Sequence, residues 1–168
     1  ADASFMLNAL NSTFNLCLDN EFLHLLASKI GSDCPVFIDN KPALAESRGE
    51  VLSEIDVDIS QYYIAIVIPP IHISTAEAYS KVTPNKARQS IKSIVNQPIS
   101  EWKKLLVNDF ETALFDTYPE LRHIKESLFN MGAIYASMSG SGSSIFGLFS
   151  ENINMEGHFS NCRVFVLK

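Results

Sequence analysis

A short segment rich in serine and glycine, residues 136–147, contains the side chains best suited to holding a small anion. Its centre consists of Ser139, Gly140, Ser141, Gly142 and Ser143, and β-prone apolar residues on both sides predict a loop between two strands. The glycines permit positive φ, so backbone amides can turn toward a ligand, and the serines add hydroxyl donors. The loop therefore suits a phosphate or diphosphate; a flexible hairpin connection is the alternative interpretation.

Asp33 is the candidate for acid–base chemistry. It lies between Gly31, which is predicted to end a helix, and Pro35, which favours an extended conformation just before it. A carboxylate presented by such a loop could accept a proton from a substrate hydroxyl or hold it in line, an effect of about 10²–10⁴-fold on rate. The alternative is a structural aspartate that accepts a hydrogen bond from a nearby backbone amide.

Thr75 and Tyr79 are the candidates for binding a flat heterocycle. They stand four residues apart in a predicted short helix capped by Ser74 or Thr75, so they share one helix face. A hydroxyl beside an aromatic ring offers a hydrogen bond and a stacking surface, whereas an ordinary cap with a packed tyrosine is the alternative. The sequence Asn-Asp-Phe-Glu at residues 108–111 predicts a helix start rather than a site, because its acidic residues complement the helix dipole.

Composition restricts the class of protein. A chain of 168 residues with 46% hydrophobic and 19% charged residues is globular rather than disordered. The net charge of -6 argues against a nucleic-acid-binding surface, and no apolar run approaches the roughly 20 residues of a membrane span. The three cysteines and four histidines are widely spaced, so we expect reduced thiols and no metal site built on them.

Hydrophobic periodicity predicts an ordered series of helices and strands. Helices are expected over residues 3–14 and 21–30, in a short stretch after residue 74, and over 86–95, 100–106, 108–115 and 119–131. Strands are expected over residues 36–38, 43–46, 50–55 and 62–68, on both sides of the serine–glycine loop, and over 163–167. Helices segregated against a largely antiparallel sheet define an α+β fold, and a domain junction is expected near residues 53–61.

Five motifs occur in a fixed order, and three of them contain candidate site residues. They are Gly31-Ser32-Asp33-Cys34-Pro35-Val36-Phe37, Glu46-Ser47-Arg48-Gly49-Glu50, Ser74-Thr75, Asn108-Asp109-Phe110-Glu111 and Met138-Ser139-Gly140-Ser141-Gly142-Ser143-Ser144. Their order and spacing resemble the later part of the 4-diphosphocytidyl-2-C-methyl-D-erythritol kinase family, within the GHMP small-molecule kinase superfamily. The resemblance runs from Asp2 to about Phe149. The loop alone is specific only to the superfamily, whereas the first two motifs point to this kinase family.

The resemblance implies an enzyme that transfers the γ-phosphate of ATP, with Mg²⁺, to the 2-hydroxyl of a cytidine-diphosphate methylerythritol. This step belongs to non-mevalonate isoprenoid biosynthesis in the bacterial cytoplasm, with a small molecule as the partner rather than nucleic acid or a membrane. Asp33 would be the catalytic residue, Ser139 to Ser143 would line the phosphate region, and Thr75 and Tyr79 would form part of the cytidine pocket. The resemblance assigns no residue of this chain as a metal ligand.

The resemblance also implies two domains: residues 1–55 as the tail of an N-terminal ATP-binding domain, and residues 56–168 as a ferredoxin-like C-terminal domain. The family's glycine-rich nucleotide loop and catalytic lysine would precede Ala1, so we expect a fragment that does not turn over by itself. Two other functions stay open. One is a GHMP kinase for a different alcohol, such as homoserine or mevalonate, and the other is a non-catalytic binding domain of this fold.

Overall fold

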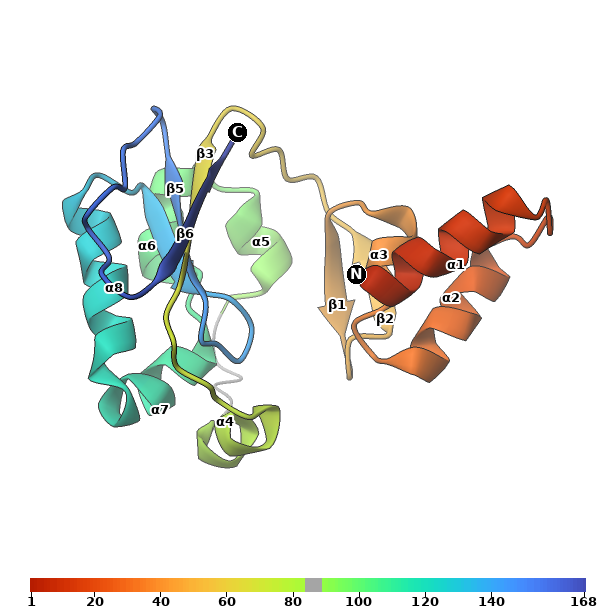
Figure 1. Ribbon diagram of the computed structural model, residues 1–168, viewed down its shortest axis with the longest axis horizontal. Helices are drawn as coiled ribbons and strands as arrows, with labels where there is room; N and C mark the ends of the chain where they lie inside the picture. The colour runs from red at the N-terminus through yellow and green to blue at the C-terminus, as the bar shows by residue number, and fades with distance from the viewer. Residues whose placement is uncertain (84–88) are drawn as a thin grey trace. The chain divides into compact units, whose positions relative to one another are not determined.

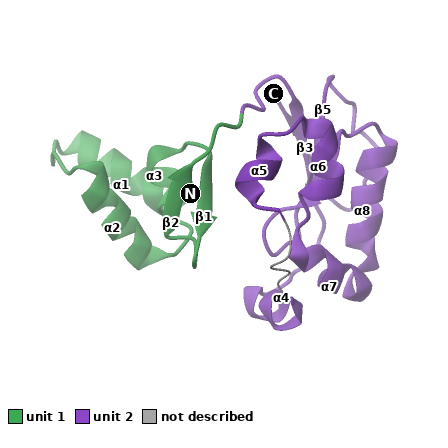
Figure 2. Ribbon diagram, turned by 180° about the vertical axis from the view of Figure 1, so that it is seen from behind, with its two compact units in different colours: residues 1–57 green, residues 58–168 purple. Residues whose placement is uncertain are grey.

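The computed structural model describes residues 1–83 and 89–168, which form two compact units, residues 1–57 and 58–168 (Figure 2). The sequence-based domain boundary, between residues 55 and 56, lies close to this division. None of the helices in the described ranges is long and apolar enough to cross a membrane.

The first unit contains three helices and one strand pair (Figure 1). They are α1 (Asp2–Thr13), α2 (Asn20–Ile30), α3 (Val36–Asp39), β1 (Ala43–Glu46) and β2 (Val51–Glu54), and the strands pair antiparallel. The Asp19 side chain is the N-cap of α2 and accepts a hydrogen bond from the Phe22 amide at 2.8 Å. A small core of Leu23, Ala27 and Ile38 joins α2 to α3.

The strand predicted over residues 36–38 is wrong, because these residues form the helix α3. Pro35 precedes α3 with φ -54, a value that the proline ring imposes and that suits the first turn of a helix. The carbonyls of Cys34 and Pro35 then accept hydrogen bonds from the amides of Phe37 and Ile38. The β propensity of Val and Ile is overridden because Ile38 becomes buried in this conformation.

The second unit is built on a four-stranded antiparallel sheet with the order β4-β5-β3-β6. The strands are β3 (Tyr63–Ile68), β4 (Tyr135–Met138), β5 (Ile145–Phe149) and β6 (Arg163–Leu167). This is the strand order of a ferredoxin-like fold, although no helix forms between β5 and β6. The predicted α+β class is therefore confirmed, and each predicted strand of this sheet is found.

Five helices of the second unit are described. They are α4 (Thr75–Lys81), α5 (Ile91–Val95), α6 (Ile99–Leu105), α7 (Asp109–Thr117) and α8 (Pro119–Asn130). The helix predicted over residues 86–95 is found from Ile91, and its residues 86–88 lie outside the described residues. Leu114, Leu121 and Leu128 are fully buried against the sheet, so α7 and α8 supply most of the helical side of the main core.

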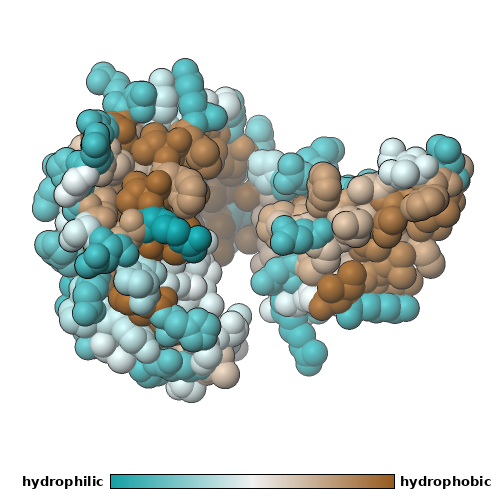
Figure 3. All heavy atoms as spheres, in the orientation of Figure 1, coloured by the Kyte–Doolittle hydropathy of each residue, from teal (hydrophilic) through white to brown (hydrophobic). Residues whose placement is uncertain are grey.

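The surface of the first unit exposes many apolar side chains of α1 and α2, visible as brown atoms in Figure 3. Phe5 is 73% exposed and Phe14 is 66% exposed. Phe22, Leu25 and Ile30 are further exposed apolar side chains. Contiguous apolar surface on a monomer is unusual, and it marks a place where further protein or ligand can bind.

Candidate functional site

Three segments of the second unit meet at one end of its sheet, where β3 ends and β5 and β6 begin. Because β3 pairs antiparallel with β5, Val67 lies opposite Ile145, so the chain leaving β3 lies beside the β4–β5 loop. The first residue of β6 pairs with Ile68 at the same end. The Ser143 hydroxyl donates a 2.5 Å hydrogen bond to the carbonyl of Ile71, so the loop is tied to the segment that leads into α4.

The β4–β5 loop, residues 139–144, has the conformation that its glycines predict. Gly140 and Gly142 have φ of 55° and 89°, in the region that favours glycine. A Cβ atom at Gly142 would lie 2.9 Å from the Met138 sulfur, so this position also lacks room for a side chain. A Cβ atom at Gly140 would meet nothing within 4 Å, so the backbone there faces open space.

The loop is closed internally but keeps backbone donors available. The Ser139 amide donates to the Ser144 carbonyl at 2.8 Å, and the Gly142 amide donates to the Ser139 carbonyl at 3.0 Å. The amides of Gly140 and Ser141 have no hydrogen-bond partner in the part of the chain that the structure describes. Successive unpaired amides in a glycine-containing turn form a concave donor set that suits a phosphate oxygen.

Asn108 connects this loop to α7, a role that sequence analysis missed. The predicted helix start is confirmed, because the Asn108 side-chain oxygen accepts a hydrogen bond from the Phe110 amide at 3.0 Å. The side-chain nitrogen of Asn108 also donates to the carbonyls of Met138 and Gly140, each at 2.8 Å. One amide side chain thus caps the helix and fixes the beginning of the loop. An asparagine at a helix start gives no sequence signal for this second contact.

Glu111 is a buried anchor rather than a solvated acid near a helix start. Its Oε1 accepts hydrogen bonds from the Met138 amide at 2.7 Å and the Ser137 hydroxyl at 3.2 Å. Its Oε2 accepts a hydrogen bond from Lys125 Nζ at 2.5 Å. Burial, the largest cause, and the negative charge of Glu111 both raise the pKa of neighbouring Tyr135. Glu111 therefore joins α7, α8 and β4 directly below the loop.

Thr75 and Tyr79 lie in α4, as predicted, and therefore share one helix face. The N-cap is Ser74, whose hydroxyl accepts a hydrogen bond from the Glu77 amide at 3.1 Å, so Thr75 is left as an exposed first residue of the helix. Tyr79 is 64% exposed, and its ring lies edge-to-face on Phe110 with a centroid distance of 5.0 Å. Tyr79 therefore keeps a free aromatic surface while one side is packed.

Charged contacts hold α4 against α7. The Glu77 carboxylate accepts hydrogen bonds from Lys81 Nζ at 3.1 Å and from the Tyr118 hydroxyl at 2.9 Å. Lys81 also donates to the Thr117 hydroxyl at 3.0 Å. The hydrogen bonds from Lys81, the larger effect, and from Tyr118 lower the pKa of Glu77. The hydrogen bond to Glu77 in turn raises the pKa of Tyr118.

Asp33 lies in the first unit, in the exposed loop between α2 and α3. Its Oδ1 accepts a 3.3 Å hydrogen bond from the Ser32 hydroxyl. An ideal Cβ at Gly49 would lie 3.0 Å from this oxygen, and Gly49 has φ +108, so the Arg-Gly-Glu turn leaves room for the carboxylate. The catalytic role that the resemblance implies for Asp33 stays a prediction.

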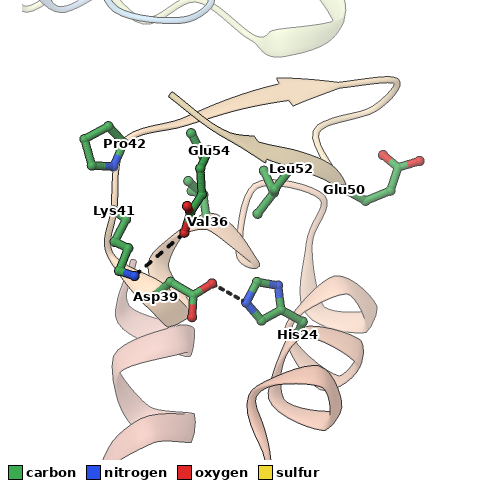
Figure 4. A pocket seen from close by; sticks show the side chains of 9 residues that line it. His24, Val36, Asp39, Lys41, Pro42, Glu50, Leu52 and Glu54 are labelled. Carbon is green, nitrogen blue, oxygen red and sulfur yellow. Dashed lines mark hydrogen bonds and ion pairs between the residues drawn. The ribbon is translucent and has the colours of Figure 1, made fainter. Parts of the chain in front are cut away.

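A cavity of about 260 Å³ in the first unit was not predicted (Figure 4). His24 Nε2 lies 2.8 Å from Asp39 Oδ2 at this cavity, and Lys41 Nζ lies 3.7 Å from Glu54 Oε1. Asp33 does not line it. Among the described residues, no group of three or more His, Cys, Asp or Glu side chains is arranged to hold a metal ion.

Comparisons with known proteins agree with this architecture. Residues 90–154 match the family described as GHMP kinases C terminal. A solved structure titled as 4-(cytidine 5'-diphospho)-2C-methyl-D-erythritol kinase superposes with a TM-score of 0.73 at 28% identity, over 88% of this chain and 54% of the other. A homoserine kinase from Cytophaga hutchinsonii superposes with a TM-score of 0.60 at 17% identity, over 94% of this chain and 60% of the other, which shows a shared fold alone.

Curated relatives have the same name as the first of these structures. A 4-diphosphocytidyl-2-C-methyl-D-erythritol kinase from Azobacteroides pseudotrichonymphae is 49% identical over 95% of this chain and 60% of its own length. The corresponding Bacteroides fragilis protein is 47% identical over 89% of this chain and 55% of its own length. The chain therefore spans somewhat more than half of the length of these relatives. Residues 90–154 thus match the family described as GHMP kinases C terminal, and the chain is similar along nearly all of its length to proteins named 4-diphosphocytidyl-2-C-methyl-D-erythritol kinase.

Proposed function

We propose that this chain is part of an ATP-dependent kinase that phosphorylates the 2-hydroxyl of 4-diphosphocytidyl-2-C-methyl-D-erythritol in the bacterial cytoplasm, a step of non-mevalonate isoprenoid biosynthesis. The observation that carries the proposal is the β4–β5 loop, with positive φ at Gly140 and Gly142 and unpaired amides at Gly140 and Ser141 within the described residues. Such a loop fits a phosphate group. The names of the homologous kinases supply the substrate.

Each candidate residue then has a distinct task. The carboxylate of Asp33 accepts the proton of the 2-hydroxyl as its oxygen forms a bond to the γ-phosphorus, while the bond to the ADP leaving group breaks. The loop residues Ser139 to Ser143 line the phosphate region, where the backbone amides of Gly140 and Ser141 donate to phosphate oxygens. Tyr79 stacks on the cytosine ring, with Thr75 on the same helix face as a hydrogen-bonding group.

ATP and Mg²⁺ are part of the proposal. The β4–β5 loop lines the phosphate region of the proposed site, and its backbone amides at Gly140 and Ser141 can donate to phosphate oxygens. A magnesium ion bound with ATP is held largely by phosphate oxygens and water, so it needs one or two carboxylates rather than a full protein cage. When bound, Mg²⁺ would neutralise charge on the phosphates, and no residue of this chain is proposed as its ligand.

The direct test measures ATP-dependent phosphorylation of the cytidyl substrate. The chain should be assayed alone and joined to the part of the Azobacteroides kinase that it does not match. We expect turnover only in the joined protein, since phosphoryl transfer depends on a complete set of donors around the phosphates. In that protein Asp33→Asn should lower kcat by about 10²-fold or more, whereas Asp56→Asn, an exposed control, should change little.

Other outcomes of this test identify the alternatives. Turnover of homoserine or mevalonate without the cytidyl substrate would assign the chain to another GHMP kinase. Binding of cytidine nucleotides with turnover that Asp33→Asn leaves unchanged would contradict the catalytic role of Asp33 and favour a non-catalytic binding domain. Turnover by the 168-residue chain alone would refute the prediction that it is incomplete.

A further inference from the structure

The first turn of α7 contacts both parts of the candidate site in the second unit. We propose that Asn108 and Phe110 are positioning residues that set the separation between the Tyr79 ring and the β4–β5 loop, and so select a ligand with an aromatic base joined through a sugar to a diphosphate. This inference rests on the proposed function, because it assumes that Tyr79 binds the base and the loop binds phosphate. It assigns the spacing of the ring and the loop to Asn108, which contacts the loop, and Phe110, which contacts the ring; neither residue is proposed to contact the ligand.

The phosphate end is fixed by Asn108. Its side-chain nitrogen holds the carbonyls of Met138 and Gly140 at 2.8 Å each, on either side of Ser139. With both carbonyls occupied by one donor group, the residues at the start of the loop have a single orientation relative to α7. The Gly140 amide remains without a partner in the described ranges, so the contact orders the loop without occupying the donor that a phosphate would use.

The base end is fixed by Phe110, two residues farther along the same turn. Its ring meets the Tyr79 ring at 74° and 5.0 Å between centroids, and it also packs against the main core. An edge-to-face contact of this kind contributes about 0.5–1.5 kcal/mol beyond the buried area. Because Tyr79 is otherwise largely exposed, Phe110 is the aromatic contact that limits the orientation of its ring.

Further contacts hold α7 at both of its ends. Glu111, in the first turn of α7, binds the Met138 amide and Lys125, and at the other end Thr117 and Tyr118 bind Lys81 and Glu77 of α4. Both α4 and β4 are therefore attached to α7 at more than one point. A fixed α7 keeps the distance between the Tyr79 ring and the β4–β5 loop constant. A constant distance is what selection of a nucleoside diphosphate by its length requires.

The test uses the 168-residue chain and three probes: cytidine, inorganic diphosphate and cytidine 5'-diphosphate, titrated by NMR. Asn108→Ser keeps a helix-capping oxygen but removes both donors to the loop. We expect this variant to bind diphosphate and cytidine 5'-diphosphate about tenfold more weakly and to bind cytidine with unchanged affinity. Phe110→Leu should bind cytidine and cytidine 5'-diphosphate about three- to tenfold more weakly and bind diphosphate with unchanged affinity. Phe129→Leu, in α8, is the control for loss of a ring.

A second measurement needs no ligand. Asn108→Ser should increase backbone motion at Gly140 and Ser141 without altering the Tyr79 ring signals. Phe110→Leu should alter the Tyr79 ring signals without changing backbone motion at Gly140 and Ser141. If wild-type chain binds the probes and both variants weaken all three equally, or neither weakens any, the spacing role is refuted while the proposed function stands. If wild-type chain binds none of the probes, the proposed phosphate and cytidine sites of this chain are refuted. The positioning role is then refuted too if the loop and ring signals do not separate.

Discussion

Replacing Glu111 tests whether a buried carboxylate supports the loop above it. The variant Glu111→Ala removes the acceptor for the Met138 amide and the Ser137 hydroxyl, and it leaves Lys125 without its counter-charge. A buried donor without a partner costs about 1–3 kcal/mol. The charge left behind costs less than the 3–5 kcal/mol of a fully buried pair, because 21% of the Lys125 side chain is exposed. We therefore expect Glu111→Ala to lower the free energy of unfolding by about 3–4 kcal/mol.

Glu111→Gln separates the hydrogen bonds from the charge. Its carbonyl oxygen can still accept from the Met138 amide, while the attraction to Lys125 is lost, so we expect a cost of about 1–2 kcal/mol. Glu126→Ala, which removes an exposed carboxylate from α8, should change stability by less than about 0.5 kcal/mol. This series distinguishes a buried anchor from a general effect of removing negative charge.

Trp102 provides a specific assay for the series. It is the chain's single tryptophan, it is only 7% exposed, and it belongs to the second unit. Urea unfolding followed by tryptophan fluorescence therefore reports on the unit that contains Glu111. If Glu111→Ala cost less than about 1 kcal/mol, or if Gln were as damaging as Ala, the assigned hydrogen-bond geometry would be refuted.

Three further predictions concern the loop, a cap and pH. Gly142→Ala should destabilise the second unit by more than Gly140→Ala in the same urea assay, because both have positive φ but only Gly142 lacks room for a Cβ; equal effects would contradict this packing. Asp19→Ala should speed amide exchange in α2 about fivefold, the effect of about 1 kcal/mol, and unchanged exchange would show that the cap is dispensable. The pKa of Glu77 is lowered, so its contact with Lys81 stabilises α4 at pH values above the ordinary pKa of the carboxyl group. This stabilisation is lost as the pH falls through the pKa of Glu77 in the folded state. An NMR titration of α4 should show the loss, and Glu77→Gln should abolish the pH dependence.

The sequence predicts well wherever a local rule decides the structure. Pro119 begins α8 at a position where its missing amide is harmless, and Asp19 and Asn108 cap helices with their side-chain oxygens. The β1–β2 pair forms on either side of Ser47-Arg48-Gly49 as expected, with Gly49 at positive φ. In each case the deciding interaction lies within a few residues of the element, so the sequence contains the information.

Prediction fails where the deciding partner is distant in the chain. Residues 36–38 have strand-forming side chains, but burial of Ile38 against Leu23 and Ala27 selects a helix. Asn108 and Glu111 have the composition of a helix start, yet their second partners lie near residues 137–140 and at Lys125. No local pattern distinguishes a capping asparagine from one that also binds a remote carbonyl, because both sequences look alike.

The central place of β3 affects how the second unit is made during synthesis. Ile64 has Leu148 as its neighbour on one side and Leu167 on the other, so neither strand that pairs with β3 exists until most of the unit has been synthesised. Pairings this remote along the chain slow folding, since long loops must close before any ladder bond forms. A ribosome-bound chain ending before residue 145 would present an apolar strand without a partner, and such a nascent chain is a natural client for chaperones.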